Sequence, residues 1–430
     1  MLTLFAALAA AEPPSLVTIA TSAGFKEGSE GFAFPHIGGT QVAFSAYDSA
    51  GESLVQQRDG KLVTVVSSSQ PNSAPEFRFT SVQSPASTDE AVAFVGSTTT
   101  AEGIFLTAYP FKSYEQIAAV GASSAAKSQN AFGAVKSPSL ERHNVAFAGT
   151  RGGLAGIYAA RSPTSDGDGS RQVHTLVNAS RTPPQHPHAP LRCLMNPSIS
   201  RAGYVAFFGS DCTGGDAGGR PLDPQRMFRT KAAHEHAVHL GDAAGVVVAG
   251  IYLAHLPAAG GAWPAAGAAD LTVVADSSTL VPGSPTDTFV AFSAPVASES
   301  MVAFVASTSA GTIGVYTYDL GAPTSLRKVA DSETAVPGGA GTFSDFPYAP
   351  SVAGTTVVFY GSAGGAASGL YAHTRASAGG EELTKLVTMA DTIGGQSIAF
   401  LGAGAASSDA TSAAFYAVTD TNGVYTVAIG

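Results

Sequence analysis

The chain has 430 residues, of which 45% are hydrophobic and only 13% charged, and its formal net charge at pH 7 is −10. An acidic chain lacks the basic surface that nucleic acids and anionic membranes require, so we expect neither as a partner. No apolar run reaches the roughly 20 residues that a membrane-spanning helix needs.

The first eleven residues are apolar except for Thr3, and they end in small side chains before Glu12. They resemble the apolar core and cleavage site of a secretory signal, although no basic leader precedes them. We expect residues 1–11 to be a signal segment and residues 12–430 to be a single extracellular domain. The alternative is that residues 1–11 form a disordered apolar tail.

A Val-Ala-Phe element recurs along the whole chain. Five strict copies lie at 42–44, 92–94, 145–147, 205–207 and 302–304, and two looser copies at 357–359 and 413–415. Most spacings between copies are roughly 50 to 60 residues, which indicates a repeat architecture.

Each repeat predicts four short strands, because its apolar runs are short, rich in β-branched and aromatic residues, and bounded by turn residues. A first strand carrying a Phe precedes Val-Ala-Phe, a third strand reads like Gly314-Val-Tyr316, and a fourth reads like 326–329. Four antiparallel strands in about fifty residues predict one blade of a β-propeller.

The copies predict an all-β fold with seven blades. The seventh copy ends at Gly430 without a fourth strand, whereas residues 16–20 near the N-terminus read like the fourth strand at 62–66. We therefore expect the N-terminal strand to complete the last blade, which removes two open sheet edges.

Cys193 and Cys212 flank the first hairpin of the fourth blade. A turn near Arg201 places the two cysteines almost opposite each other across that hairpin, as disulfide geometry requires. We predict a disulfide, and with it an oxidising compartment. The alternative is a pair of buried free thiols.

Candidate site residues gather at the junction of the third and fourth blades. His186, His188 and Arg192 lie in a proline-rich segment on the face where fourth-to-first and second-to-third loops meet. Alternating prolines predict an extended segment with His186 and His188 pointing the same way. Ligands commonly bind on such a face, at the mouth of the central channel.

One spacing between repeats is about forty residues longer than its neighbours, which predicts an insertion over roughly residues 211–245 of blade four. It contains His234, His236 and His239. These imidazoles suit a metal such as zinc, but His236 also suits acid–base catalysis, and an ordinary polar loop is the third reading.

A recurring polar residue ends the fourth strands. It is Asp276, Asp331 or Asp391 in three blades. A ring of carboxylates suits a cation, but these residue types also serve turns, which we favour. Zinc and calcium are the candidate metals.

The unit V-A-F-x-G, G-I-Y, V-A-D-x-x-T-x-x-P-G-G resembles the repeats of uncharacterised secreted propeller-like proteins of bacteria and algae, best from Leu271 to Ala403. The resemblance implies a secreted seven-bladed propeller and carries no activity over. Some polysaccharide lyases are also seven-bladed propellers, which is an analogy of fold alone.

Two functions of different classes follow. The first is a secreted binding or scaffold protein, expected to be a monomer, that presents loops to a glycan or protein ligand. The second is a lyase-like enzyme acting on polysaccharide, with His186, His188 or His236 as base and Arg192 neutralising a substrate carboxylate.

Overall fold

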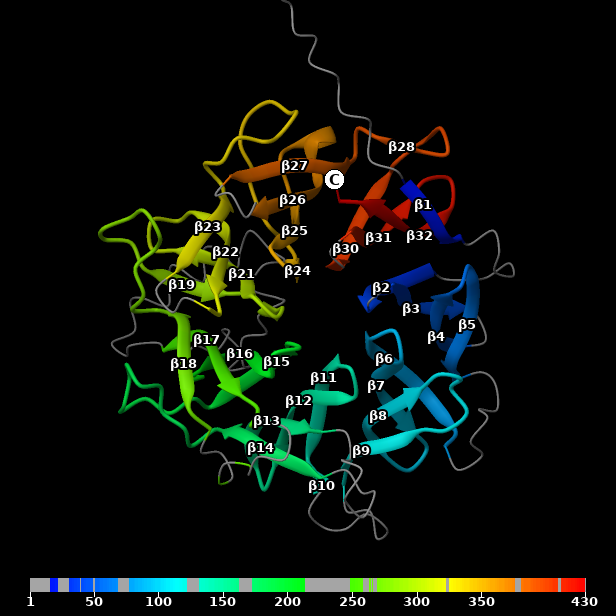
Figure 1. Ribbon diagram of the computed structural model, residues 1–430, viewed down its shortest axis with the longest axis vertical. Coiled ribbons are helices and arrows are strands. Elements are labelled where there is room, and N and C mark those ends of the chain that lie inside the picture. Colours follow the sequence, from blue (N-terminus) through cyan, green and yellow to red (C-terminus); the bar gives the residue numbers. More distant parts are fainter. Residues whose placement is uncertain are drawn as a thin grey trace, which may run out of the picture.

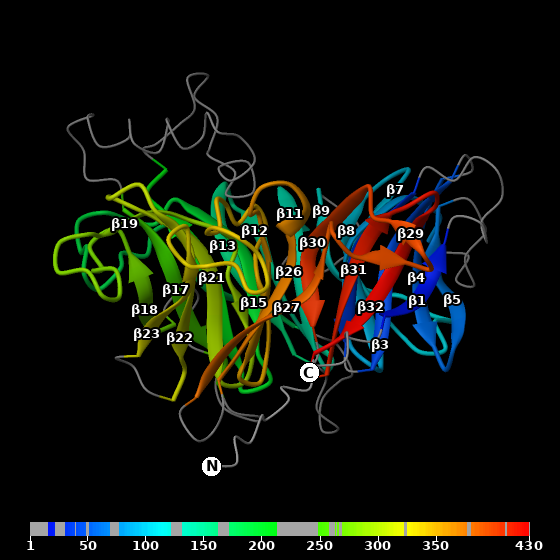
Figure 2. The same ribbon diagram turned by 90° about the horizontal axis from the view of Figure 1, so that it is seen from above.

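The computed structural model describes residues 16–21, 31–38, 40–48, 51–68, 77–121, 131–161, 172–212, 248–257, 263, 265, 269–321, 325–375, 380–408 and 411–429. Within these ranges the chain forms seven antiparallel sheets arranged in a ring (Figure 1), which confirms the predicted seven-bladed propeller. Figure 2 shows the blades standing side by side across a disc. No helix in the described ranges is long and apolar enough to cross a bilayer.

In each of the first four blades, four strands that follow one another in the chain pair antiparallel with their neighbours. Blade 1 contains β2 (Gly31–Gly38), β3 (Gln41–Asp48), β4 (Gly51–Arg58) and β5 (Lys61–Ser67). Blade 2 contains β6 (Phe79–Ser87), β7 (Ala91–Thr98), β8 (Glu102–Ala108) and β9 (Glu115–Val120). Blade 3 contains β11 (Ala134–Glu141), β12 (Asn144–Arg151), β13 (Leu154–Ala160) and β14 (Val173–Asn178). Blade 4 contains β15 (Cys193–Ile199), β16 (Tyr204–Ser210), β17 (Ala249–His255) and β18 (Leu271–Asp276).

The remaining blades follow the same order. Blade 5 contains β19 (Phe289–Phe292), β20 (Val296–Ala297), β21 (Met301–Thr308), β22 (Ile313–Asp319) and β23 (Leu326–Asp331). Blade 6 contains β24 (Ser351–Ala353), β25 (Thr356–Gly361), β26 (Gly369–Arg375) and β27 (Glu381–Thr388). Blade 7 contains β30 (Phe400–Ser408), β31 (Ser412–Val418), β32 (Asn422–Ala428) and β1 (Leu16–Thr21). A small hairpin of β28 (Thr392–Ile393) and β29 (Gln396–Ser397) joins blades 6 and 7.

The ring is closed by the two ends of the described chain. Strand β1 pairs antiparallel with β32, so that Leu16 lies opposite Val427 and Thr21 opposite Gly423. Blade 7 therefore takes its outer strand from the N-terminal side, as predicted. Both strands gain a hydrogen-bonded partner along an edge that would otherwise be open.

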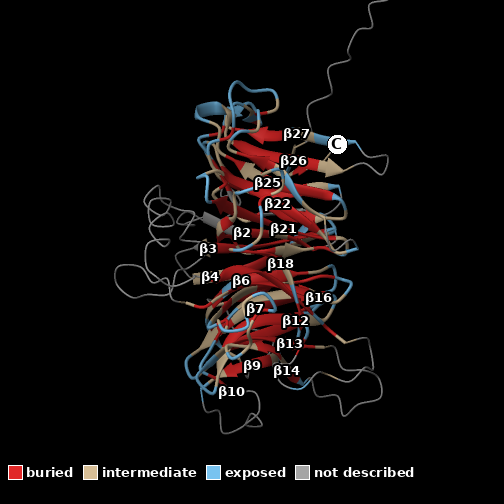
Figure 3. Ribbon diagram, turned by 90° about the vertical axis from the view of Figure 1, so that its left-hand side faces the viewer, coloured by how far each residue is buried: buried red, intermediate tan, exposed pale blue. Residues whose placement is uncertain are grey.

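The core lies between blades, where one sheet face packs against the next. Phe147 and Tyr158 of blade 3, for example, are fully buried in one cluster with Ala93 and Ile104 of blade 2. Figure 3 shows this burial along the strands. Burial on both faces explains why the chain is so poor in charge, because charged side chains are rarely buried unless paired.

A recurring glycine makes room for the Phe of the first strand. The ring of Phe79 lies edge-on to Phe105, with centroids 4.8 Å apart. A Cβ on Gly96 would lie only 2.6 Å from that ring. The glycine of V-A-F-x-G is thus a packing requirement.

The first strand of blade 3 differs from the prediction. The sequence predicts that the first strand of each blade carries a Phe, but Phe132 belongs to β10 (Ala131–Phe132), which pairs parallel with β9 of blade 2. Its ring nevertheless packs edge-on against Tyr158 of blade 3, 4.7 Å between centroids. Phe132 therefore joins the two blades, and the break at Gly133 separates its backbone pairing from that of β11.

Candidate functional site

One end of blade four brings together the loops that the sequence singled out. Cys193 at the start of β15 pairs with Ser210 at the end of β16, and Ser210 pairs with Ala249 at the start of β17. Asp276 at the end of β18 pairs with Gly250 in the next row. The loop 179–192 and the chain leaving β16 therefore emerge at the same end of this blade.

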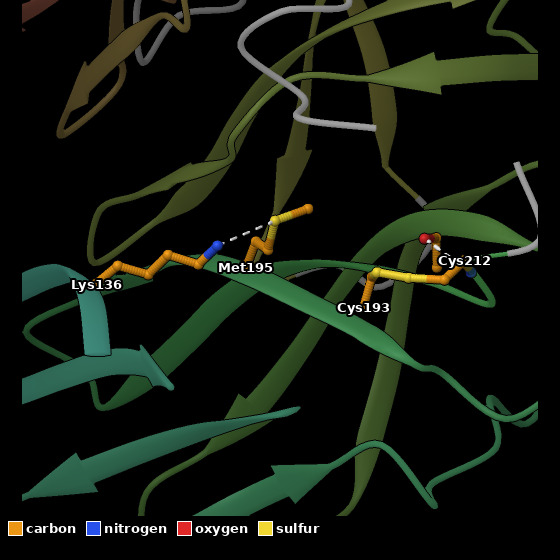
Figure 4. The surroundings of a disulfide bond; sticks show 5 residues. Lys136, Cys193, Met195 and Cys212 are labelled. Carbon is orange, nitrogen blue, oxygen red and sulfur yellow. Dashed lines mark hydrogen bonds between the residues drawn. A yellow bond between two sulfur atoms is a disulfide. The ribbon is translucent and has the colours of Figure 1, made fainter. Parts of the chain in front are cut away.

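A disulfide joins these two loops. The Cα atoms of Cys193 and Cys212 lie 5.6 Å apart, and the predicted bond between them is confirmed. Figure 4 shows the disulfide beside Met195, whose sulfur lies 3.9 Å from the Lys136 Nζ of blade 3. The disulfide fixes the point at which the chain leaves β16 for the insertion.

The proline-rich segment is not extended as predicted. The His186 N–H donates to the Pro183 carbonyl, and the Ala189 N–H donates to the His186 carbonyl, each at 3.1 Å, so two turns follow each other. Proline fixes φ near −65°, which suits the second position of such a turn as well as an extended chain. Pro184 and Pro187 occupy these second positions.

The turns separate the two histidines. The His186 side chain is only 16% exposed, and its Nε2 lies 3.4 Å from Oδ2 of Asp276. His188 is exposed, as is Arg192, which directly precedes the disulfide. Of these three residues, His186 is the one for which the described part of the chain shows a titratable neighbour, Asp276.

Asp276 is fully buried and only one of its oxygens is hydrogen-bonded. Its Oδ1 accepts bonds from the Ser278 N–H at 2.9 Å, the Ser278 hydroxyl at 2.7 Å and the Thr279 hydroxyl at 3.0 Å. Its Oδ2 and the facing Nε2 of His186 form no hydrogen bond in the described part of the chain. Buried polar atoms are usually hydrogen-bonded, so this oxygen is unusual.

Tyr252 lies close to the same carboxylate. Its ring is fully buried, and its hydroxyl also has no hydrogen-bond partner among the described residues. Burial, and then the charges of Asp276 and Asp211, raise the pKa of Tyr252, so that the side chain stays a neutral phenol. Asp211 is buried at the end of the disulfide hairpin, where its Oδ2 accepts from the Val248 N–H at 3.3 Å.

In blades 5 and 6 a lysine pairs with the aspartate at the end of the blade, and the fourth strand of blade 4 has no such lysine. In blade 5 the Lys328 Nζ lies 2.7 Å from Asp331 Oδ2, and in blade 6 the Lys385 Nζ lies 3.0 Å from Asp391 Oδ1. Both lysines pair with the tyrosine of the third strand. The residue paired with Tyr252 in blade 4 is Val273. Asp276 therefore has no lysine on its own strand to pair with, and His186 of the preceding loop lies beside it instead.

The three aspartates are not equivalent, contrary to the sequence alignment. Gly314 pairs with Asp331, but the matching Gly369 of blade 6 pairs with Thr388. Asp391 comes three residues later and bonds back, its Oδ2 accepting from the Thr388 N–H at 2.8 Å and hydroxyl at 2.9 Å. Asp331 likewise accepts from the Thr334 hydroxyl at 2.8 Å. These contacts confirm that the carboxylates serve turns.

The histidines of the insertion, His234, His236 and His239, lie outside the described residues, so their roles as metal ligands or base stay predictions. In the ranges that the structure does describe, no three His, Cys, Asp or Glu side chains gather closely enough to hold a metal. Sequence reasoning missed Tyr252 and Asp211. A strand-by-strand alignment of the repeats would have shown Val273 in place of lysine.

No protein-family model matches the chain, and no curated protein is similar to it in sequence. Several solved structures are similar. A puromycin-hydrolysing peptidase of Mycobacterium tuberculosis has a TM-score of 0.49 and 12% identity, over 90% of this chain and 48% of that one. TolB from Acinetobacter baumannii has a TM-score of 0.40 and 13% identity, over 90% and 63%. The β-propeller domain of the Trilobed protease from Pyrococcus furiosus has a TM-score of 0.34 and 8% identity, over 84% and 99%. The chain thus spans about half the length of the first of these proteins.

Proposed function

We propose that this chain is a secreted binding protein that presents the loop face of blade four to a glycan. The observation that carries the proposal is Oδ2 of Asp276, which is buried and accepts no hydrogen bond among the described residues. A buried carboxylate oxygen without a donor is costly. A ligand that brings a donor to this oxygen gains the interaction that Lys328 supplies in blade 5.

The chemistry of the neighbouring groups fits a hydroxyl-rich ligand. A sugar hydroxyl can donate to Asp276 and accept from the neutral phenol of Tyr252, which lies close to that carboxylate. His186 Nε2 lies 3.4 Å from this oxygen, so a ligand that donates to Asp276 takes the place of the imidazole, and His186 has to move. Two turn hydrogen bonds, one with Pro183 and one with Ala189, hold the backbone at His186, so a movement limited to this part of the loop breaks only these two of the described backbone bonds.

Binding is better supported than catalysis. A lyase needs a base and a cation that converge on one substrate, whereas His186 faces Asp276 and both His188 and Arg192 are exposed. The disulfide supports an extracellular location, since such bonds persist in oxidising compartments.

A glycan array probed with the purified protein tests this proposal, with ultraviolet absorbance monitored for unsaturated uronate products. We expect at least one glycan class to be retained without product. Retention should fall at least tenfold in Asp276→Asn and persist in Asp331→Asn, the matched carboxylate of blade 5. Thermal unfolding of both variants confirms that they are folded.

Three outcomes count against the proposal. Product formation would favour the lyase-like enzyme. Retention that is unchanged in Asp276→Asn would move the site elsewhere. Retention of no glycan at all would contradict the choice of ligand and leave the protein ligand as the alternative.

A further inference from the structure

The seam between blades 7 and 1 differs from the other seams in one side chain. Six blades pair a Phe of the second strand with an aromatic residue of the third, with ring centroids 5.6 to 6.0 Å apart. These pairs are Phe94–Phe105, Phe147–Tyr158, Phe207–Tyr252, Phe304–Tyr316, Phe359–Tyr371 and Phe415–Tyr425. In blade 1 the residue opposite Phe44 is Val55.

The aromatic ring of the third strand normally fills the space toward the preceding blade. Tyr158, for example, packs in one cluster with Ile104 of that blade. Val55 occupies the same place toward blade 7, in a cluster with Ala20 and Val424. Valine is much smaller than a tyrosine or phenylalanine ring, so this seam is left underfilled at its outer end.

A cavity of about 490 Å³ lies at this place. Its walls are residues 18–21 of β1 on one side and Val55, Leu62 and Thr64 of blade 1 on the other. Figure 1 places these strands at the rim of the ring, where β1 and β5 face each other. The volume is in the range of small-molecule pockets, roughly 300 to 1,000 Å³.

The lining defines the chemistry of an occupant. Among the described residues that line the cavity, Ile19, Ala20, Val55 and Leu62 are apolar, the threonine hydroxyls are the side-chain polar groups, and none is charged. Leu62 is 43% exposed at the edge of the cavity. These residues offer no counter-charge to a charged ligand, whereas a neutral ring can fill an apolar cavity of this kind.

We propose that this seam pocket binds a neutral phenolic ring. The walls correspond to those that hold a tyrosine or phenylalanine ring in the other six blades, and a threonine hydroxyl at the rim can pair with the phenol. The ring belongs either to a small phenolic molecule or to a tyrosine of a partner protein. The site lies on the rim and is independent of the glycan proposed for blade four.

Ligand-observed NMR with p-cresol tests the pocket on the whole chain. We expect saturable binding with a dissociation constant on the order of a millimolar, as for a fragment of this size. Val55→Tyr supplies the ring internally, so it should weaken p-cresol binding at least tenfold and raise the melting temperature. Thr64→Tyr, at an exposed position on the mouth, should also weaken binding without disturbing the core.

A second titration with N-acetyl-tyrosinamide distinguishes the two sources of the ring. Tighter binding than p-cresol favours a partner's tyrosine, and weaker binding favours a free phenol. The proposal is overturned if p-cresol shows no saturable binding, or if Val55→Tyr and Thr64→Tyr both bind it as the wild type does.

Discussion

The guanidinium of Arg375 lies 2.7 Å from Oδ2 of Asp319, and this contact joins blade 6 to blade 5. Arg327 of blade 5 lies 3.7 Å from the same oxygen and 3.8 Å from Glu381 of blade 6. The Arg375 and Asp319 side chains are 24% and 13% exposed. Such a partly buried, shared pair is worth more than an ion pair on the open surface.

Replacing Arg375 by Met keeps the aliphatic packing and removes the charge. We expect a loss of about 1 to 3 kcal/mol of unfolding free energy, because Asp319 is left partly buried without its nearest cation. Arg201→Met is the matched control, since its contact with Glu141 involves a side chain that is 63% exposed. Chemical denaturation measures both, and an equal effect in the two variants would refute the distinction.

The buried His36 should make the folded protein less stable in mild acid. Its Nδ1 lies 3.0 Å from the Ser87 hydroxyl and accepts from the Ser87 N–H at 3.3 Å, which joins β2 to β6. Burial lowers the pKa of His36 from 6.5 to about 4. The unfolded chain therefore takes up the proton first, and stability falls as pH drops from about 6.5 toward 4.

Thermal unfolding between pH 7.5 and 4.5 measures this effect. In His36→Gln, which does not titrate, the decline of the melting temperature over this window should be shallower than in the wild type. A parallel decline in the two proteins would show that other groups cause the acid sensitivity.

Asp319 carries a second acid dependence at lower pH. Burial alone would raise its pKa, but the hydrogen bond and charge of Arg375, with smaller effects of Ser325 and Arg327, hold the pKa below its ordinary value of 3.8. Its contribution to stability is present above that value and is lost as pH falls below it. The gap in melting temperature between wild type and Asp319→Asn should therefore narrow as pH falls below 3.8, and a constant gap between them would contradict this.

The disulfide closes a loop of 19 residues in sequence. Its removal in the Cys193→Ser, Cys212→Ser double variant should lower the unfolding free energy by about 2 to 4 kcal/mol, chiefly by freeing the unfolded chain. Reductant should lower the melting temperature of the wild type to about that of the double variant, and it should leave the melting temperature of the double variant unchanged. A wild type that is insensitive to reductant would contradict this.

The features that could be predicted from the sequence are those that depend on the repeats and on strand register. Seven copies of one pattern specified seven blades, the match of residues 16–20 to a fourth strand specified the closure, and the hairpin register placed Cys193 near Cys212. Each of these depends on strand pairing, whose period of two residues is visible in the chain.

The sequence did not predict what depends on side-chain neighbours. Proline is compatible with both an extended chain and a turn, so the path of 183–189 was ambiguous. The sequence pattern aligned Asp391 with Asp276, but Asp391 corresponds in position to Thr279. In blade 6 the hydroxyl of Thr388 donates to Asp391, so the hydroxyl comes first and the carboxylate three residues later, the reverse of the order in blade 4. The contact of His186 with Asp276 joins a loop to a strand some ninety residues away, and a local sequence pattern cannot predict such a contact.

Val273→Lys tests the role of Asp276 most directly. Lysine at this position, opposite Tyr252, reproduces the arrangement in which Lys328 bonds to Asp331. The measurement is the affinity of this variant for the glycan retained on the array. We expect a higher melting temperature and at least tenfold weaker binding, because the added ammonium takes the oxygen that the glycan uses. Unchanged affinity in a variant with a raised melting temperature would contradict the assignment of Asp276 to the ligand.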